Sequence, residues 1–120
     1  MKRDWDVIRS VLLEVEALKP SQADFQYTAV FKSDDEDSVR ALHAFLLYER
    51  GYLKGIDSGS LHDRALISPE LTMDGADLLD SIREQKLWDK IKEIAKDRGV
   101  GLAFDTVKAL AGIAFTQLMS

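Results

Sequence analysis

Four consecutive acidic side chains form the densest group of potential metal ligands in the sequence: Asp34, Asp35, Glu36 and Asp37. A hard cation needs several oxygen ligands around one point. Consecutive residues of a helix point in different directions, so these four carboxylates cannot converge on one ion without further ligands. Acids at the start of a helix are also favoured by the helix dipole and by free backbone N–H groups. We therefore interpret the run as the start of a helix and predict no metal site and no cofactor.

The two histidines, His43 and His62, lie far apart and outside the H-E-x-x-H and H-x-x-E-H motifs. A catalytic base or a metal site needs a partner residue, and no motif in the sequence supplies one for either histidine. The carboxylates of Asp80 and Glu84 lie one helical turn apart, but basic neighbours indicate a solvated charged face. No G-x-S-x-G, Walker or G-x-G-x-x-G motif is present. We therefore predict that the protein is not an enzyme, and we expect His43 to be partly exposed.

The composition is that of one ordinary globular domain. The chain has 120 residues, of which 46% are hydrophobic and 31% charged, and this length can bury a core. The absence of cysteine excludes disulfides and thiolate zinc sites and fits a reducing cytoplasm. No apolar run approaches the ~20 residues of a membrane span, and the N-terminus lacks the apolar region of a signal peptide. We expect a cytoplasmic protein with no membrane partner.

Hydrophobic periodicity predicts two helices separated by an extended segment. Residues 3–18 carry apolar side chains at spacings of three and four, including Trp5, which we assign to the core. Alternation over residues 25–31 favours a strand or an extended connector. The next helix is predicted over residues 34–50, and its expected buried stripe consists of Val39, Leu42 and Leu46.

Both ends of helix 34–50 carry recognisable signals. Ser33 and Glu36 have the S-x-x-E spacing of a capping box, in which each side chain binds the backbone N–H of the other residue. Gly51 stands where a left-handed C-terminal cap is expected. The sequence therefore predicts clear boundaries for this helix.

A β-hairpin and a long helix are predicted next. Two short β-like runs flank a turn-rich loop, which predicts a hairpin over residues 54–69. Thr72 is the expected N-cap of a helix over residues 72–98, whose buried face includes Trp88. Gly75 lies in its first turn, where glycine costs up to about 1 kcal/mol relative to alanine. We interpret Gly75 as a site of tight packing against neighbouring backbone; the alternative is that it is merely tolerated.

These elements predict a single α+β domain, mostly α, over residues 1–120, with a helix-helix-wing core in residues 1–71. The segments ALHAFLLYERGYLKGID and LTMDGADLLD resemble the pattern L-x-x-L-x-x-x-G-[LY]-[IL] … L-T-x-x-G-x-x-[LF]-L of winged-helix proteins. This resemblance implies a winged-helix (winged helix-turn-helix-like) fold, with a long helix after the wing and a further helix at the C-terminus.

A more specific resemblance covers nearly the whole chain. The segments MKRDWDVIRSVLLEVE, LLYERGYLKGID and LTMDGADLLDSIREQKLWDKIK are similar to the motifs MKRD-x-D-L-I-R and L-T-W-x-G-H-[ED]-F-L-D-x-[IA]-R-x-x-x-x-W-x-K. These motifs belong to an uncharacterised phage and prophage family, domain of unknown function 2513. The chain departs from the second motif at Met73, Ala76 and Leu78, and matches it at Gly75, Leu79, Asp80, Arg83, Trp88 and Lys90. The resemblance implies a phage or prophage origin, hence the cytoplasm of a bacterial host, and it implies no activity.

DNA binding is the usual role of a winged helix, which inserts its recognition helix into the major groove and touches phosphates with its wing. The candidate interaction residues on helix 34–50 and the wing are Arg40, His43, Tyr48, Lys54, His62 and Arg64. However, residues 21–50 hold three basic and six acidic side chains, a net charge of −3, which would repel phosphates. We therefore predict a non-enzymatic module that binds a host or phage protein, with a DNA-binding transcriptional regulator as the alternative.

The last predicted helix, over residues 103–119, is apolar on more than one side. An exposed apolar face implies a partner protein or a second copy of the chain. The candidate dimer or partner face consists of Val107, Leu110, Ile113, Phe115 and Leu118. The alternative is a helix buried on two sides between the long helix and the winged core, so a homodimer remains an open prediction.

Overall fold

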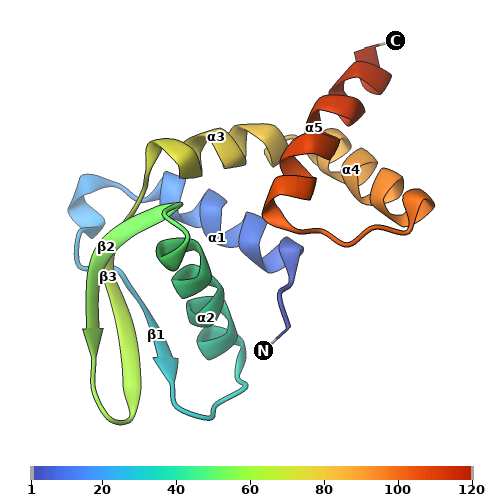
Figure 1. Cartoon of the computed structure of the whole chain (residues 1–120). Coiled ribbons are helices and arrows are strands. Elements are labelled where there is room, and N and C mark those ends of the chain that lie inside the picture. The colour runs from blue at the N-terminus through green and yellow to red at the C-terminus, as the bar shows by residue number, and fades with distance from the viewer. Residues whose placement is uncertain (1, 120) are drawn as a thin grey trace. The chain divides into compact units, whose positions relative to one another are not determined.

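The computed structural model describes residues 2–119, which form two compact units, one ending at Ala76 and the other beginning at Asp77. The assignment of residues 1–120 to one domain stays a prediction. The elements in chain order (Figure 1) are α1 (Trp5–Ala17), the 3-10 helix η1 (Pro20–Gln22), β1 (Gln26–Val30), α2 (Glu36–Glu49), β2 (Leu53–Gly59), β3 (Asp63–Leu71), α3 (Met73–Ile82), α4 (Gln85–Arg98) and α5 (Phe104–Met119). The predicted class, α+β and mostly α, is confirmed.

The three strands form one antiparallel sheet in the order β1-β3-β2. The alternating segment before α2 is therefore a strand, and its Tyr27 and Ala29 are buried. The predicted hairpin exists as β2 and β3, with a register irregularity around Gly55. A Cβ atom at position 55 would lie 2.9 Å from the carbonyl oxygen of Ile67. This close approach of the two strands therefore requires glycine at position 55.

Two helices pack on this sheet: α2 lies against β1, while α1 lies against α2 and β3. The predicted N-terminal helix is confirmed, and its buried stripe begins at Trp5. Asp4 caps α1, because its carboxylate accepts a hydrogen bond from the backbone N–H of Asp6 at 2.9 Å. The buried core of this unit includes Ile8, Val11, Leu12, Ala41, Ala44, Phe45, Leu47 and Leu66.

The start of α2 differs from the predicted capping box. The N-cap is Asp35, whose carboxylate accepts the backbone N–H of Ser38 at 2.6 Å. Ser33 supports this cap from outside the helix, since its hydroxyl donates to Asp35 at 2.7 Å. Glu36 is an exposed first helical residue. The prediction was wrong because Asp35, which caps helices about as well as serine does, lies between the two expected partners and is placed to accept the N–H of Ser38.

The predicted buried stripe of α2 was also wrong. Val39, Leu42 and Leu46 are only half-buried, whereas Ala41 and Ala44 are fully buried. The helix packs against both α1 and β1, and small side chains let the backbones approach closely. The prediction placed Val39, Leu42 and Leu46 on the core face, so the predicted orientation of the helix about its axis differs from the observed one.

The other end of α2 confirms the predicted left-handed cap. Gly51 has φ +82°, and its N–H donates to the carbonyl of Tyr48 at 3.1 Å. The N–H of Tyr52 reaches the carbonyl of Leu47 at 2.8 Å, which completes the two hydrogen bonds of a Schellman motif. The chain is thereby turned out of the helix and into β2.

The end of α2 is tied to the beginning of α3. The Thr72 hydroxyl donates to the carbonyl of Gly51 at 2.5 Å and accepts the backbone N–H of Gly75 at 3.0 Å, as an N-cap does. A Cβ atom on Gly75 would stand 1.9 Å from the carbonyl oxygen of Tyr52. Gly75 is therefore a site of close backbone approach, which confirms the interpretation made from the sequence.

The predicted helix over residues 72–98 is two helices, because Arg83 and Glu84 are not helical. Ile91 lies nine residues after Ile82, and nine residues turn an α-helix about two and a half times. These two buried side chains would therefore lie on opposite sides of one continuous helix. The break allows each segment to bury its own apolar face.

In the second unit, α4 packs against α5. Gly99 ends α4 with φ +66°. Trp88 is fully buried, as predicted, together with Ile91 of α4 and Phe104 and Val107 of α5. Across residues 2–119 the helices are too short or too polar to cross a membrane.

The order of helix, strand, helix and hairpin follows the predicted order, but the winged-helix assignment stays a prediction. A helix-turn-helix needs two helices joined by a short turn. In the part of the chain that the structure describes, α2 is the only α-helix between β1 and β2, and η1 and β1 separate α2 from α1. The hairpin is therefore present without a helix-turn-helix pair before it.

Candidate interaction surface

A surface groove of about 550 Å³ lies where the end of β1, the start of α2 and the tip of the hairpin meet. We call it the tip groove. Its lining is mainly apolar, and it consists of Ala29, Val30, Phe31, Lys32, Ser33, Asp34, Val39, Leu42, Ser60, Leu61, Asp63 and Arg64. All of these residues belong to the first unit.

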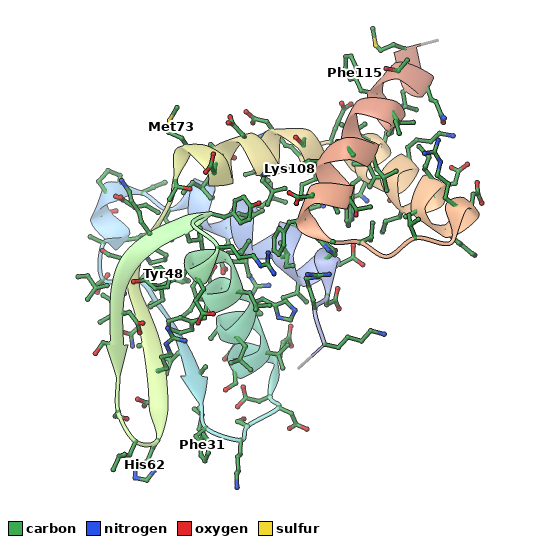
Figure 2. The ribbon with its side chains drawn as sticks, viewed as in Figure 1. Phe31, Tyr48, His62, Met73, Lys108 and Phe115 are labelled. Carbon is green, nitrogen blue, oxygen red and sulfur yellow. The ribbon has the colours of Figure 1, made fainter. Side chains whose placement is uncertain are left out.

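The two most exposed large apolar side chains of this groove are Phe31, which is 68% exposed, and Leu61, which is 91% exposed. Figure 2 shows Phe31 beside the hairpin tip, where His62 is labelled. A backbone hydrogen bond joins the end of β1 to the hairpin tip, because the N–H of Phe31 donates to the carbonyl of His62 at 2.8 Å. Apolar side chains that are gathered and exposed in this way mark interaction sites more often than scattered ones do.

Short-range hydrogen bonds fix both sides of the groove. After β1, Lys32 adopts φ +59°, and the N–H of Ser33 donates to the carbonyl of Val30 at 3.1 Å, which closes a tight turn. At the hairpin tip, the Ser60 hydroxyl accepts the backbone N–H groups of His62 and Asp63, each at 3.2 Å. The groove is therefore formed by defined turns, and an incoming partner would meet a preformed surface.

The predicted wing residue Arg64 is already occupied by intramolecular contacts. Its guanidinium contacts Asp57 at 2.7 Å and Glu49 at 2.9 Å and lies 3.9 Å from the centre of the Phe45 ring. Hydrogen bonding to Asp57 and Glu49 raises the pKa of Arg64. Hydrogen bonds from Arg64 likewise lower the pKa of Asp57. The charge of Arg64 is thus compensated within the molecule.

The other predicted interaction residues are dispersed. Lys54 pairs with Glu70 at 3.4 Å on the hairpin. His62 is exposed at the hairpin tip. Tyr48 is half-buried, with its ring edge-on to Phe45 at 6.2 Å between centroids. These side chains do not form one continuous basic surface.

His43 is fully buried, contrary to the expected partial exposure. Its Nε2 accepts the backbone N–H of Asp4 at 2.9 Å, and Nδ1 lies 2.7 Å from the carbonyl of Val39. An N–H donor on one side and a carbonyl acceptor on the other require the neutral tautomer with the proton on Nδ1. His43 therefore joins the start of α1 to α2 and is not available to a partner.

Arg40 also links α1 to α2. Its guanidinium contacts the carboxylate of Glu14 at 2.9 Å and the hydroxyl of Ser10 at 2.9 Å. The same carboxylate accepts the Tyr27 hydroxyl at 2.6 Å. Burial and the hydrogen bond to Glu14 raise the pKa of Tyr27. This polar network joins α1, α2 and β1.

Removing Glu14 should change the acid stability of the protein. Burial alone would raise the pKa of Glu14, but hydrogen bonds from Tyr27 and Arg40 outweigh it and lower the pKa below its ordinary 4.5. The stabilisation is therefore complete above that value and is lost as the pH falls through the lowered pKa. We predict that Glu14→Gln is less stable than wild type at neutral pH. The difference should shrink on acidification, as measured by urea unfolding at a series of pH values; a constant difference would contradict the prediction.

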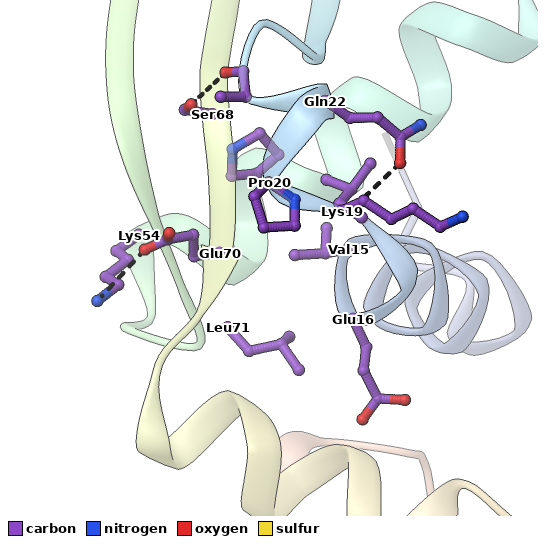
Figure 3. Close-up of a pocket in the computed structure, with 12 residues that line it drawn as sticks. Val15, Glu16, Lys19, Pro20, Gln22, Lys54, Ser68, Glu70 and Leu71 are labelled. Atoms are coloured by element: carbon purple, nitrogen blue, oxygen red, sulfur yellow. Dashed lines mark hydrogen bonds and ion pairs between the residues drawn. The ribbon is translucent and has the colours of Figure 1, made fainter.

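A second cavity, of about 470 Å³, lies between the end of α1, η1 and β3 (Figure 3). Its charged lining includes the Lys54–Glu70 ion pair, and Ser68 donates to the carbonyl of Ala23 across one side. Apolar side chains here, such as Val15, belong to the buried core. The cavity lacks the exposed aromatic and aliphatic side chains of the tip groove, so we place the candidate site at the groove.

The predicted face of α5 is divided. Val107 and Leu110 are buried within the second unit, whereas Phe115 and Leu118 are exposed and Ile113 is half-buried. The large apolar side chains that α5 exposes to solvent therefore lie in its last turns. Within the described range, no group of three or more His, Asp or Glu side chains is arranged to hold a metal ion.

Sequence reasoning missed Phe31 and Leu61, the central residues of the tip groove. Phe31 continues the alternation of β1, which suggested a buried position, but the strand ends at Val30. Leu61 is a large apolar residue within a turn-rich loop. That mismatch between residue type and loop was the available signal.

Comparison with known proteins identifies the family of the chain but assigns no activity to it. A profile of the family described as "Hypothetical protein (DUF2513)" matches residues 2–101. The chain is also similar to an uncharacterized protein of Haemophilus influenzae strain Rd, with 33% identity over 120 residues that span the whole of both chains. No solved structure matches the chain. The matched range includes the tip groove and ends before α5.

Proposed function

Because the chain belongs to the DUF2513 family of hypothetical proteins, we propose its function from the chemistry of its own surface: a non-enzymatic interaction module that binds a partner protein through the tip groove. The observation that carries this proposal is the joint exposure of Phe31 and Leu61 at one preformed apolar groove. Burying two such side chains against a partner supplies about 1.5–3 kcal/mol each. We further propose a phage or prophage origin and action in the bacterial cytoplasm, where a host or phage protein is the partner.

Replacing the two exposed side chains should abolish partner binding without unfolding the protein. Phe31→Ser with Leu61→Ser removes the apolar anchors at positions where the native state leaves them in water, so stability should change by less than about 0.5 kcal/mol. The tagged wild type and variant are compared by quantitative mass spectrometry after capture from bacterial host lysate. We expect proteins enriched by the wild type to be lost from the variant.

A matched control removes apolar surface elsewhere. Ile56→Ser with Met73→Ser alters two residues that are 61% and 84% exposed and do not line the tip groove. This control should retain the same captured proteins as the wild type. Equal capture by the groove variant would show that binding, if any, uses another surface.

The alternative, a DNA-binding regulator on a winged-helix-like scaffold, has less support. Acidic side chains form ion pairs with Arg64, Lys54 and Arg40, and phosphate binding would have to displace these acids. The acidic start of α2 lies where a recognition helix would meet DNA. A mobility-shift assay with promoter and unrelated DNA at 50 mM salt separates the two functions: retention with a steep salt dependence would favour DNA.

We also propose that the exposed end of α5 pairs with a second copy of the chain. The support is the group of exposed apolar side chains formed by Phe115, Leu118 and Met119 in the last turns of α5. Light scattering should report a dimer for the wild type and a monomer for Phe115→Ser with Leu118→Ser. A monomeric wild type would remove this proposal and leave the groove unaffected.

A further inference from the structure

The charges around the tip groove are unbalanced. Asp34 lines the groove, and exposed Glu36 lies one helical turn before Val39, which also lines it. Asp63 adds a third carboxylate at the groove, and its Oδ1 accepts a hydrogen bond from the Ser60 hydroxyl at 2.8 Å. Asp34 and Asp63 thus line a groove whose surface is mainly apolar, and Glu36 lies near it on α2.

Few positive charges offset them. Arg64 is neutralised by Asp57 and Glu49 on its other side. The ammonium of Lys32 lies 5.5 Å from the centre of the Phe31 ring and is the remaining basic group of the groove lining. The dipole at the start of α2 contributes about half a positive charge, and Asp35 already serves as the N-cap there. The rim of the groove therefore keeps a net negative charge.

From this pattern we infer that the occupant of the tip groove is a short peptide segment of the partner in which apolar anchor side chains are flanked by Lys or Arg. The inference rests on the proposed function and specifies its partner. The apolar anchors would cover Phe31 and Leu61, and the flanking cations would face Asp34 and Glu36. The volume of about 550 Å³ lies within the ~300–1,000 Å³ of ligand sites, so the groove fits a segment of a few residues.

Complementary charges of this kind act mainly through association rate and specificity. Because the acids are exposed, each favourable pair contributes little to the affinity and is screened by salt. The apolar anchors must therefore supply most of the affinity, while the acids select which apolar segments bind. This division of roles can be tested separately.

The test uses a library of random ten-residue peptides displayed by mRNA display. The library is selected on the full-length protein and depleted against the Phe31→Ser, Leu61→Ser variant. We expect enriched peptides to combine large apolar residues with Lys or Arg and to be poor in Asp and Glu. Enrichment of acidic flanks, or no charge preference, would overturn the inference while leaving groove binding intact.

The strongest enriched peptide is then titrated by fluorescence anisotropy against charge variants. Asp34→Asn with Glu36→Gln should weaken binding about three- to tenfold at 50 mM salt, and the difference should nearly vanish at 500 mM. Asp97→Asn with Glu84→Gln makes the same change in net charge at two residues of the second unit that do not line the groove, and it should have no effect. Equal weakening by both pairs would show that only net charge matters and would refute a specific role for the rim.

A selection that yields no groove-dependent peptide would also overturn the inference, because a linear segment would then not be the occupant. That result does not decide the proposed function. Capture of a folded partner by the wild type, and its loss from the groove variant, would still support protein binding through the groove. The two failures are thereby distinguished.

Discussion

Replacing Gly75 by alanine should lower the free energy of unfolding by about 3 kcal/mol or more, at the upper end of the cost of overpacking. The added Cβ would lie 1.9 Å from the carbonyl oxygen and 2.9 Å from the carbonyl carbon of Tyr52. Both are backbone atoms, so no side-chain rotation can relieve the overlap. The backbone of α3 would have to move away from Tyr52, and this movement would strain the Thr72 hydrogen bonds that join α2 to α3. Urea unfolding followed by circular dichroism measures the effect.

The matched control is Gly112→Ala, which makes the same substitution in α5. A Cβ at position 112 would meet no atom within 4 Å, and alanine favours a helix over glycine by about 0.5–1 kcal/mol. This variant should be as stable as the wild type or slightly more stable. If Gly75→Ala behaved like Gly112→Ala, the close approach to Tyr52 would not exist in solution.

Replacing His43 by alanine should cost about 2–4 kcal/mol, because it leaves a cavity and removes the acceptor of a backbone N–H. The imidazole is fully buried and bridges the N–H of Asp4 and the carbonyl of Val39. Loss of this bridge should loosen the first turn of α1 as well as lower global stability. Amide hydrogen exchange should therefore be faster at Asp4 in the variant, even under conditions where it is fully folded.

His62→Ala provides the comparison. This imidazole stands exposed at the hairpin tip (Figure 2), so its removal should change stability by less than about 0.5 kcal/mol. Similar losses for the two histidine variants would contradict the structural assignment of His43. The pair also shows that the two histidines, which look alike in sequence, have unrelated roles.

Local signals predicted the parts of the fold that depend on local chemistry. Gly51 requires a left-handed conformation and stands at the end of α2, so both the cap and the helix end could be read directly. The N-cap role of Thr72 and the close packing of Gly75 followed from their spacing at the start of a helix. In these cases a few neighbouring residues contain the whole physical cause.

Predictions that depended on distant partners failed more often. The orientation of α2 is set by packing against α1 and β1, so its large half-buried residues misled the assignment of the core face. His43 was misplaced for the same reason, since its partner Asp4 is 39 residues away. The break at Arg83 and Glu84 was readable from the phase of the apolar residues, but only by comparing the two halves of the presumed helix.

The candidate site was the least predictable part. The sequence drew attention to charged and histidine side chains, yet the structure gives Arg40, His43 and Arg64 internal partners. The tip groove depends instead on Phe31 and Leu61, which are far apart in sequence and line the same groove because β1 pairs with β3. Strand register is a long-range property that hydrophobic periodicity alone does not determine.

The hydrogen bond from Thr72 to Gly51 has an evolutionary consequence for the hairpin. It ties together the residues that immediately precede and follow the two strands, as does the pairing of Leu53 with Leu71. With its base clamped in this way, the loop at the opposite end can gain, lose or exchange residues without disturbing the helices. New side chains at the hairpin tip would then reshape the lining of the tip groove while the base of the hairpin keeps its geometry.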